Sequence, residues 1–414
     1  MDITILLHWA EFAARWLHVI TAMAWIGSSF YFIALDLGLR RDPKPTSGAD
    51  GQEWQVHGGG FYHIQKYMIA PAELPEHLTW FKWESYATWL SGVALLILLY
   101  WVGAELYLID WAVMPLRPWQ AIVISALSLV LGWVIYDMLC KSPLRHQPMI
   151  LMLALFAVIV AWAWGYTQVF SGRAALLHLG ALTATIMTAN VAMIIIPNQK
   201  IVVADLKAGR TPDAKYGTIA KLRSTHNNYL TLPVIFLMLS NHYPLAFAGD
   251  YNWIIAALVF LMGVLIRHFF NTMHARKGYL WWTWGATVAV FFVIVYLSTL
   301  PLMRDDTEPE PGAAARLTPA QARFADHPDF AIIADIVYTR CSMCHAAEVF
   351  WPGLVGAPRG VRLDTNAYVA AQARMIYLQS GVSHAMPPNN LSAMEHTERA
   401  AIRAWYRAVT DGGF

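Results

Sequence analysis

Apolar runs long enough to cross a lipid bilayer recur through about the first 300 residues of the chain. A helix needs about 20 apolar residues to span the hydrocarbon core. The sixth run is the least regular, because Asn241 and His242 interrupt its end. We expect an all-α polytopic bundle of about eight transmembrane helices, over residues 12–38, 82–103, 119–140, 148–170, 174–197, 228–247, 252–275 and 278–301.

Charge supports lipid as the main solvent and sets the orientation. Only 14% of the residues are charged, against about 25% in soluble domains. Lys and Arg accumulate in cytoplasmic loops. The even loops hold only Arg117 and Arg173, and the odd loops hold Arg40, Arg41, Lys44, Lys66, Lys141, Arg145, Lys200, Lys207, Arg210, Lys215, Lys221, Arg223, Arg276 and Lys277.

This asymmetry predicts that both termini lie outside the cytoplasm. The opening MDITILLHW lacks a basic segment, so no cleavable signal peptide is expected. We therefore expect a multi-pass protein of a bacterial inner (plasma) membrane. The net charge of +2 gives no reason to expect a nucleic-acid partner.

The composition changes after Pro301. The stretch 304–312, RDDTEPEPG, is acidic and rich in proline, as linkers are. We divide the chain into a transmembrane domain over 1–301, a linker over 302–317 and a small soluble domain over 318–414.

The soluble domain contains the motif CSMCH at residues 341–345. Two thiols at this spacing, followed by histidine, are the attachment signature of a c-type haem. Met386 lies 41 residues beyond His345 in the string HAMPPNN and is the expected second iron ligand, with His384 as the competing one. We expect a class I-like cytochrome c domain with one covalent haem c, outside the cytoplasm. The alternative is a zinc site or a redox thiol pair. The third cysteine, Cys140, is expected to be a small buried hydrophobic residue.

Ionisable residues inside the spans are candidates for function. His18 in the first span and His178 in the fifth lie at similar depth, and two histidines on facing helices can hold a haem b. A haem b between them is one hypothesis. The alternative is that each histidine is hydrogen-bonded within the bundle or lies near the headgroups.

A second polar group lies near the expected cytoplasmic face. In the seventh span, Arg267, His268, Asn271 and His274 fall on about one side of a helix. Amide, imidazole and basic groups elsewhere are expected nearby: Arg223, His226, Asn227, Asn228, Asn190, Asn198, Gln199, Lys82, Glu84, His57, Tyr62, His63, Lys66 and His77. Such side chains suit a small, planar, anionic ligand that forms hydrogen bonds. The alternative is interfacial anchoring together with the cytoplasmic excess of positive charge.

Two long segments carry a resemblance. The strings WQVHGGGFYHIQKYMIAPAELPEHLTWFKWESYATWLSG (54–92) and RSTHNNYLTLPVIFLMLSNHYP (223–244) resemble the membrane-bound, cytochrome c-linked urate oxidases, also called urate hydroxylases. The likeness covers essentially the whole chain. It implies oxidation and hydration of urate to 5-hydroxyisourate without hydrogen peroxide. Electrons would leave through the fused haem c to a respiratory acceptor, a cytochrome c or a terminal oxidase. The family's haem ligands fall on Cys341, Cys344, His345 and, by position, Met386.

The resemblance supplies no catalytic residues, so those we name rest on side-chain chemistry. Arg223, Arg267 or Lys66 would hold the urate monoanion. Asn228 and Asn271 would bind its amide edges. His226 or His268 would take a proton, because the pKa of imidazole lies near the working pH.

Two other functions fit parts of the sequence. One is a different cytochrome c-linked membrane dehydrogenase, acting on a quinol or another purine. The other is a membrane-anchored electron carrier without enzymatic activity. One span would suffice for an anchor, so eight spans with polar clusters argue against the carrier.

Overall fold

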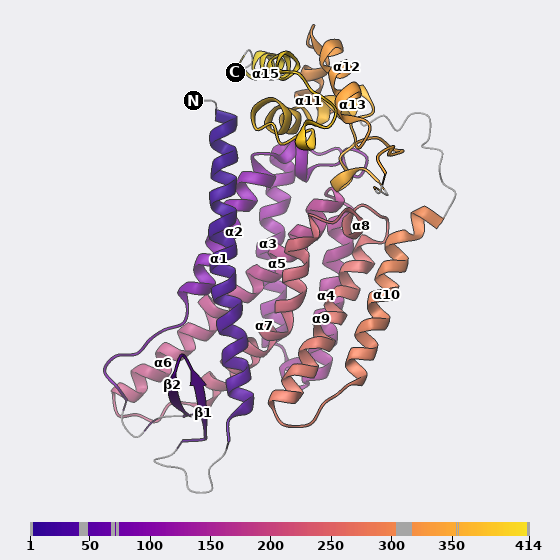
Figure 1. Cartoon of the computed structure of the whole chain (residues 1–414). Helices are drawn as coiled ribbons and strands as arrows, with labels where there is room; N and C mark the ends of the chain where they lie inside the picture. The colour runs from indigo at the N-terminus through magenta and orange to yellow at the C-terminus, as the bar shows by residue number, and fades with distance from the viewer. Residues whose placement is uncertain are drawn as a thin grey trace.

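The structure is a computed structural model of the chain, and it describes residues 3–40, 49–67, 71, 74–303, 317–352, 354 and 356–411. Long helices stand side by side in a bundle, and a smaller helical unit lies at one end of it, next to the N-terminus (Figure 1). Residues 304–316, most of the expected linker, lie outside the described residues.

The bundle has long helices at all eight expected positions within the described part of the chain. Three short pieces join them: the 3-10 helix η4 (Pro143–His146), the π-helix η3 (Ala104–Leu108) and the helix α8 (Pro244–Phe247). The long elements are α1 (Ile3–Gly38), α2 (Trp83–Leu96) with the π-helix η2 (Ile97–Trp101), α3 (Pro118–Lys141), α4 (Pro148–Thr167), α5 (Gly172–Ala189) with the π-helix η5 (Asn190–Ile195) and α6 (Ile196–Lys207), α7 (Ala214–Ser240), α9 (Asn252–His274) and α10 (Trp282–Met303).

Six of these segments are long and apolar enough to cross a membrane, by length and composition, in the part of the chain that the structure describes. They are α1, α3, α4, the continuous segment Gly172–Lys207, α9 and α10. The other two expected spans, α2 and α7, do not qualify. The α-helical part of α2 has 14 residues. The helix α7 begins at Ala214 rather than at residue 228, because its polar first half continues the same helix.

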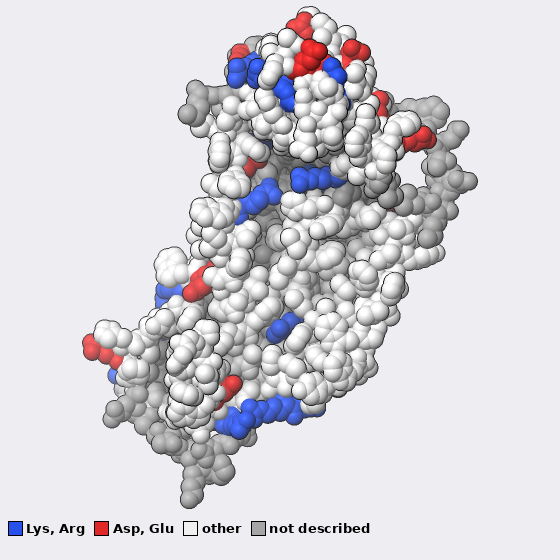
Figure 2. Space-filling model, in the orientation of Figure 1, with Lys and Arg blue, Asp and Glu red and all other residues white. Residues whose placement is uncertain are grey.

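Large apolar side chains cover the outside of the bundle. On α1, Trp9, Trp16 and Met23 are more than 60% exposed, and on α10 Phe292 is 64% exposed. Charged side chains lie mainly at the two ends of the molecule and at the waist below the C-terminal unit (Figure 2). An apolar belt between charged ends is compatible with a multi-pass membrane protein.

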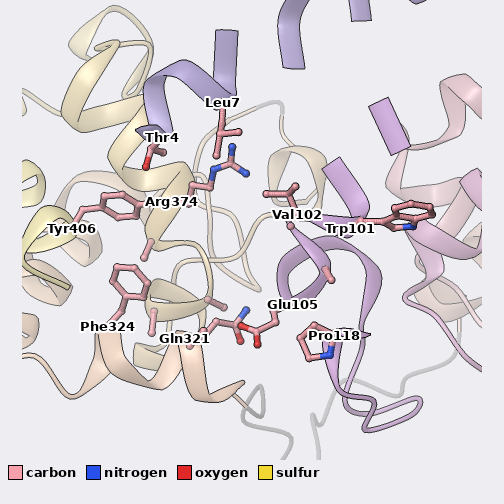
Figure 3. Close-up of a pocket in the computed structure, with 16 residues that line it drawn as sticks. Thr4, Leu7, Trp101, Val102, Glu105, Pro118, Gln321, Phe324, Arg374 and Tyr406 are labelled. Atoms are coloured by element: carbon pink, nitrogen blue, oxygen red, sulfur yellow. The ribbon is translucent and has the colours of Figure 1, made fainter. Parts of the chain in front are cut away.

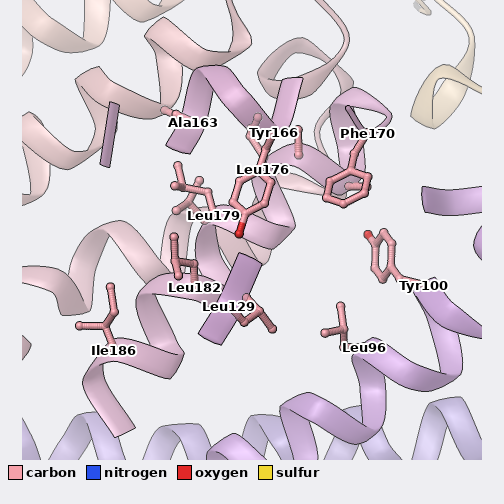
Figure 4. Close-up of a cluster of buried hydrophobic side chains, with 14 of the residues drawn as sticks. Leu96, Tyr100, Leu129, Ala163, Tyr166, Phe170, Leu176, Leu179, Leu182 and Ile186 are labelled. Carbon is pink, nitrogen blue, oxygen red and sulfur yellow. The ribbon is translucent and has the colours of Figure 1, made fainter. Parts of the chain in front are cut away.

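The bundle is closed by tightly packed helices. Its main core lies between α2, α3, α4 and α5, where Leu129, Tyr166 and Leu179 are buried (Figure 4). Small residues let neighbouring helices approach. A Cβ on Gly132 would lie 2.1 Å from Leu182 Cδ1, and one on Gly263 would lie 2.6 Å from Pro233 Cδ.

A β-hairpin after α1 departs from the all-α prediction. The strands β1 (Gly51–His57) and β2 (Gly60–Lys66) pair antiparallel. Gly58 and Gly59 turn the chain with positive φ values of 59° and 82°, which is the backbone that a two-residue hairpin loop requires. An ion pair between Lys66 and Asp36 holds the hairpin to the end of α1.

The C-terminal unit has a hydrophobic core of its own, within which Val337, Tyr377, Ile402 and Trp405 are at most 1% exposed. The amphipathic helix α15 packs on α12 and η7. Its elements are α11 (Pro319–Ala325), α12 (Phe330–Cys341), η6 (Pro358–Gly360), α13 (Asn366–Ala371), α14 (Ala373–Ile376), η7 (Tyr377–Val382), η8 (Pro388–Asn390) and α15 (His396–Asp411).

Polar contacts hold this unit on the bundle. Arg374 lies 2.7 Å from Glu11 of α1, and Thr318 donates a hydrogen bond of 3.2 Å to Glu105. A cavity of about 470 Å³ lies between the two parts (Figure 3). Arg374 and Glu105, which line it, both take part in the contacts between the two parts.

Candidate functional site

One polar network lies inside the bundle between α3 and α7. Arg223 is 2% exposed and lies 2.6 Å from Asp137. Its Nη1 donates to Asn190 Oδ1 at 3.3 Å, and its guanidinium lies over the Tyr136 ring. Asn190 begins the π-helix η5, a distortion that often occurs at functional sites.

The same network holds His226. Its Nδ1 lies 2.9 Å from the Tyr136 hydroxyl, which accepts a hydrogen bond from Asn190 Nδ2. Asn190 also donates to Asn227. Cys140 is buried, as expected, with its Sγ 3.8 Å from His226 Nδ1. Arg223 and His226 therefore have protein partners already, and we assign them to the support of the bundle.

A second cluster lies on the other side of α7 and contains buried polar atoms without hydrogen-bond partners. Asn228 Nδ2 and Arg267 Nη2 both donate to Asn271 Oδ1, at 3.1 and 3.2 Å. The guanidinium of Arg267 lies 4.3 Å from the centre of the Phe30 ring. Asn228 Oδ1 and Arg267 Nε are buried without a hydrogen-bond partner. Unpaired buried polar atoms are costly, so this cluster is suited to a ligand. We call it the Arg267 cluster.

Two further unpartnered polar atoms lie on the hairpin side of the Arg267 cluster. His274 follows Arg267 by seven residues on α9, and its Nδ1 is buried without a partner. Glu53 of β1 interacts electrostatically with His274, and Glu53 Oε2 is also unpartnered. The free imidazole nitrogen could take a proton from a ligand bound at Arg267.

Two other candidate residues, His268 and Lys66, do not belong to the Arg267 cluster. His268 is exposed, and its Nδ1 lies 3.4 Å from the Tyr229 hydroxyl, so it points to another face of α9 than Arg267. The expectation that these two residues share a side is wrong, because one helical residue turns the side chain by about 100°. Lys66 is occupied by Asp36.

In the C-terminal unit, the CSMCH motif follows the end of α12. Cys341 and Cys344 are free thiols. His345 Nδ1 lies 2.7 Å from the Val361 carbonyl. A hydrogen bond from Nδ1–H orients the ring and leaves Nε2 free for a metal, as is common for ligating histidines.

The loop that carries Met386 is held from α15. Arg399 is 4% exposed and donates to the carbonyls of Met386 and Ser380, at 2.9 and 2.6 Å. Two free thiols, a histidine fixed through Nδ1 and an anchored methionine are the groups that a covalent haem c needs. The residues present therefore fit that group.

The alternatives for this motif find less support. Burial raises the pKa of the Cys341 thiol to about 12, which disfavours the reactive thiolate that a redox pair would need. Within the described residues, no group of three or more His, Cys, Asp and Glu side chains could hold a metal ion.

An ion pair joins the helix of the first cysteine to α15. Arg340 Nε donates to both carboxylate oxygens of Glu398 at 3.0 Å. Burial alone would raise the pKa of Glu398, but hydrogen bonds from Arg340 and from the Glu395 backbone hold that pKa below its usual range. The pair thus keeps α15 packed beside the CSMCH motif at neutral pH.

The two histidines proposed for a haem b form hydrogen bonds with different helices of the bundle. His18 Nδ1 lies 3.0 Å from the Thr88 carbonyl, on α2. His178 is fully buried; its Nε2 lies 2.7 Å from Ser125 Oγ and its Nδ1 lies 2.8 Å from the Ala174 carbonyl. The ring centre of Phe170 lies 4.7 Å from that of His178. These contacts favour the alternative, in which each histidine is hydrogen-bonded in the bundle.

The fold is a helical bundle compatible with a multi-pass membrane protein, and it holds a buried cluster of cationic and amide groups. A family model described as "Urate oxidase N-terminal" matches residues 4–298. The chain therefore belongs to the urate oxidase N-terminal family, which indicates an oxidoreductase acting on urate. No curated protein and no solved structure matches the chain. The urate oxidase part of the resemblance is confirmed. The C-terminal unit lies outside the match, so its cytochrome c character stays a prediction.

Proposed function

We propose that the bundle binds urate at the Arg267 cluster and oxidises it to 5-hydroxyisourate. We propose further that the electrons pass to a haem c in the C-terminal unit. The observation that carries this proposal is the pair of buried, unpartnered atoms Arg267 Nε and Asn228 Oδ1 beside the Phe30 ring. Urate is a planar monoanion with N–H donors and carbonyl acceptors. The Arg267 cluster offers a cation and a hydrogen-bond acceptor beside an aromatic ring.

Each residue of the Arg267 cluster has its own role. Arg267 holds the negative charge, and Asn228 and Asn271 bind the amide edges of the purine. Urate and one water yield 5-hydroxyisourate, two electrons and the protons released. His274 takes a proton as the electrons leave, in place of His226 or His268, because its Nδ1 is unpartnered. Water then adds to the oxidised carbon.

The electrons must travel along the bundle. Arg267 lies 15 residues after Asn252 on α9, or about 22 Å along the helix at 1.5 Å per residue. Buried aromatic rings occupy the bundle toward the C-terminal unit. Tyr100 lies 6.3 Å from Tyr107, and the Tyr107 hydroxyl lies 3.4 Å from Met375 Sδ. We place the electron path along these contacts.

The C-terminal unit receives the electrons. Cys341 and Cys344 would attach the haem, and His345 and Met386 would ligate its iron. Haem c supplies one-electron redox chemistry when bound. The final acceptor of the electrons would be a respiratory cytochrome c or terminal oxidase outside the cytoplasm. Because oxygen does not receive electrons directly from urate, no hydrogen peroxide forms.

The source of the oxygen atom in the product tests this reaction. Turnover in water labelled with ¹⁸O is expected to give 5-hydroxyisourate with one labelled oxygen, and no hydrogen peroxide above the background of membranes lacking the protein. Label entering from ¹⁸O-labelled oxygen gas, or one equivalent of peroxide per urate, would contradict the proposal.

A further inference from the structure

Three arginines converge at the recess between the bundle and the C-terminal unit. Arg15 belongs to α1, Arg173 to the first turn of α5 and Arg359 to η6 of the C-terminal unit. All three interact electrostatically with His242, which follows α7. Figure 2 shows basic side chains gathered at this recessed waist. We call Arg15, Arg173 and Arg359 the waist arginines.

The waist arginines have no counterion in the described part of the chain. None of them forms an ion pair or a hydrogen bond there, and Arg173 contacts the Phe247 ring at 5.1 Å. By contrast, Arg374 at the same interface lies 2.7 Å from Glu11. Arg15 and Arg173 are half-buried. Half-buried cations that repel one another are stabilised by an anion between them.

The position of Arg359 indicates which anion the waist arginines would bind. Arg359 lies two residues before Val361, whose carbonyl lies 2.7 Å from His345 Nδ1. Arg359 therefore lies close to the histidine that would ligate the haem iron, and the shared interaction with His242 places Arg15 and Arg173 on the same side of the C-terminal unit. A haem carries two carboxylates on the edge opposite the groups that react with the cysteines. Arginine is suited to carboxylates because its planar fork can form two parallel hydrogen bonds.

We propose that Arg15 and Arg173 of the bundle, together with Arg359, pair with the carboxylates of the haem. The bundle thereby completes the haem pocket of the C-terminal unit. This inference rests on the proposed haem c and adds residues from the membrane part to its site. Arg15 and Arg173 are positioning residues, which hold the haem edge against the outer end of the bundle.

The pairing has a consequence for the haem potential. Positive charge near the iron stabilises the reduced state, which carries one positive charge less. Neutralising Arg15 or Arg173 should therefore lower the midpoint potential of the haem. Both arginines also interact electrostatically with Tyr100 and Tyr107, so the same charges lie beside the proposed electron path.

The test is a redox titration of the full-length protein, purified in detergent with its haem. We expect Arg15→Gln and Arg173→Gln each to lower the potential, and the double variant to shift the ratio of oxidised to reduced haem about tenfold, or about 59 mV for one electron. Arg15→Lys and Arg173→Lys should retain most of the wild-type potential. Arg117→Gln, at an exposed arginine on the same side of the bundle, is the matched control and should not shift it.

The outcomes separate this inference from the proposed function. Covalent haem in all variants, with potentials equal to that of the Arg117→Gln control, would overturn the role of the waist arginines and leave the proposed function standing. An unchanged potential with a raised KM for urate would also overturn it, because the anion would then be urate. Wild-type protein without covalent haem would overturn both.

Discussion

Replacing Cys341 and Cys344 together by alanine is expected to remove covalent haem from the protein and to reduce urate-driven electron transfer to the background of control membranes. The two thiols supply the covalent bonds, and at the end of α12 they lie next to His345. A haemochrome spectrum of purified, denatured protein measures the attached haem, and acceptor reduction by urate measures turnover.

Cys140→Ala is the matched control, because Cys140 is buried in the bundle beside His226 and has no part in haem attachment. It should retain covalent haem and at least half of the turnover. Full urate turnover in the double variant, in protein shown to be free of covalent haem, would contradict the role of the C-terminal unit.

Replacing Arg267 by glutamine is expected to lower kcat/KM for urate about 10- to 150-fold, through the loss of one hydrogen bond to a charged group. Hydrogen bonds to charged groups contribute about 1.5–3 kcal/mol each, and every 1.36 kcal/mol is a factor of ten. Because Arg267 has no carboxylate partner among its contacts with Asn271 and Phe30, its loss leaves no buried anion unpaired. The variant should fold, and most of the loss should appear in KM.

Arg223→Gln provides the contrast. Arg223 lies 2.6 Å from Asp137, whose side chain is 16% exposed, so the substitution leaves a largely buried carboxylate with Lys141 as its remaining cation. We expect lower yield and lower thermal stability, with KM little changed in the protein that folds. If Arg267→Gln kept kcat/KM within threefold of wild type, the assignment of urate binding to the Arg267 cluster would be wrong.

The long apolar runs made the bundle predictable, because hydropathy alone decides where a helix can cross lipid. Hydropathy was less informative for α7, where polar residues are buried inside the bundle rather than left in a loop. The β-hairpin was also missed. Its signal was present in Gly58 and Gly59 of the HGGG string, flanked by strands that alternate between faces.

The sequence predicted which kinds of polar side chain the site contains. It did not predict which of them belong to the ligand site and which support the bundle. Asp137 stands as a charged residue in an apolar span and could have been recognised as a partner for a basic residue. Its pairing with Arg223 moves that arginine from the ligand site to the scaffold. Phe30 and Glu53 gave no signal, because they are distant in sequence from Arg267 and His274. The packing of α1 on α9 brings Phe30 to Arg267, and Glu53 interacts with His274 electrostatically.

The most direct test of the account is the anaerobic addition of urate to the purified protein, with visible spectra recorded. Each urate yields two electrons and each chain is expected to hold one haem c, so half an equivalent of urate should reduce the haem completely. The Arg267→Gln variant should do so far more slowly at the same urate concentration. A haem that dithionite reduces fully but urate leaves oxidised would contradict the claim that urate oxidation in the bundle supplies the C-terminal unit with electrons.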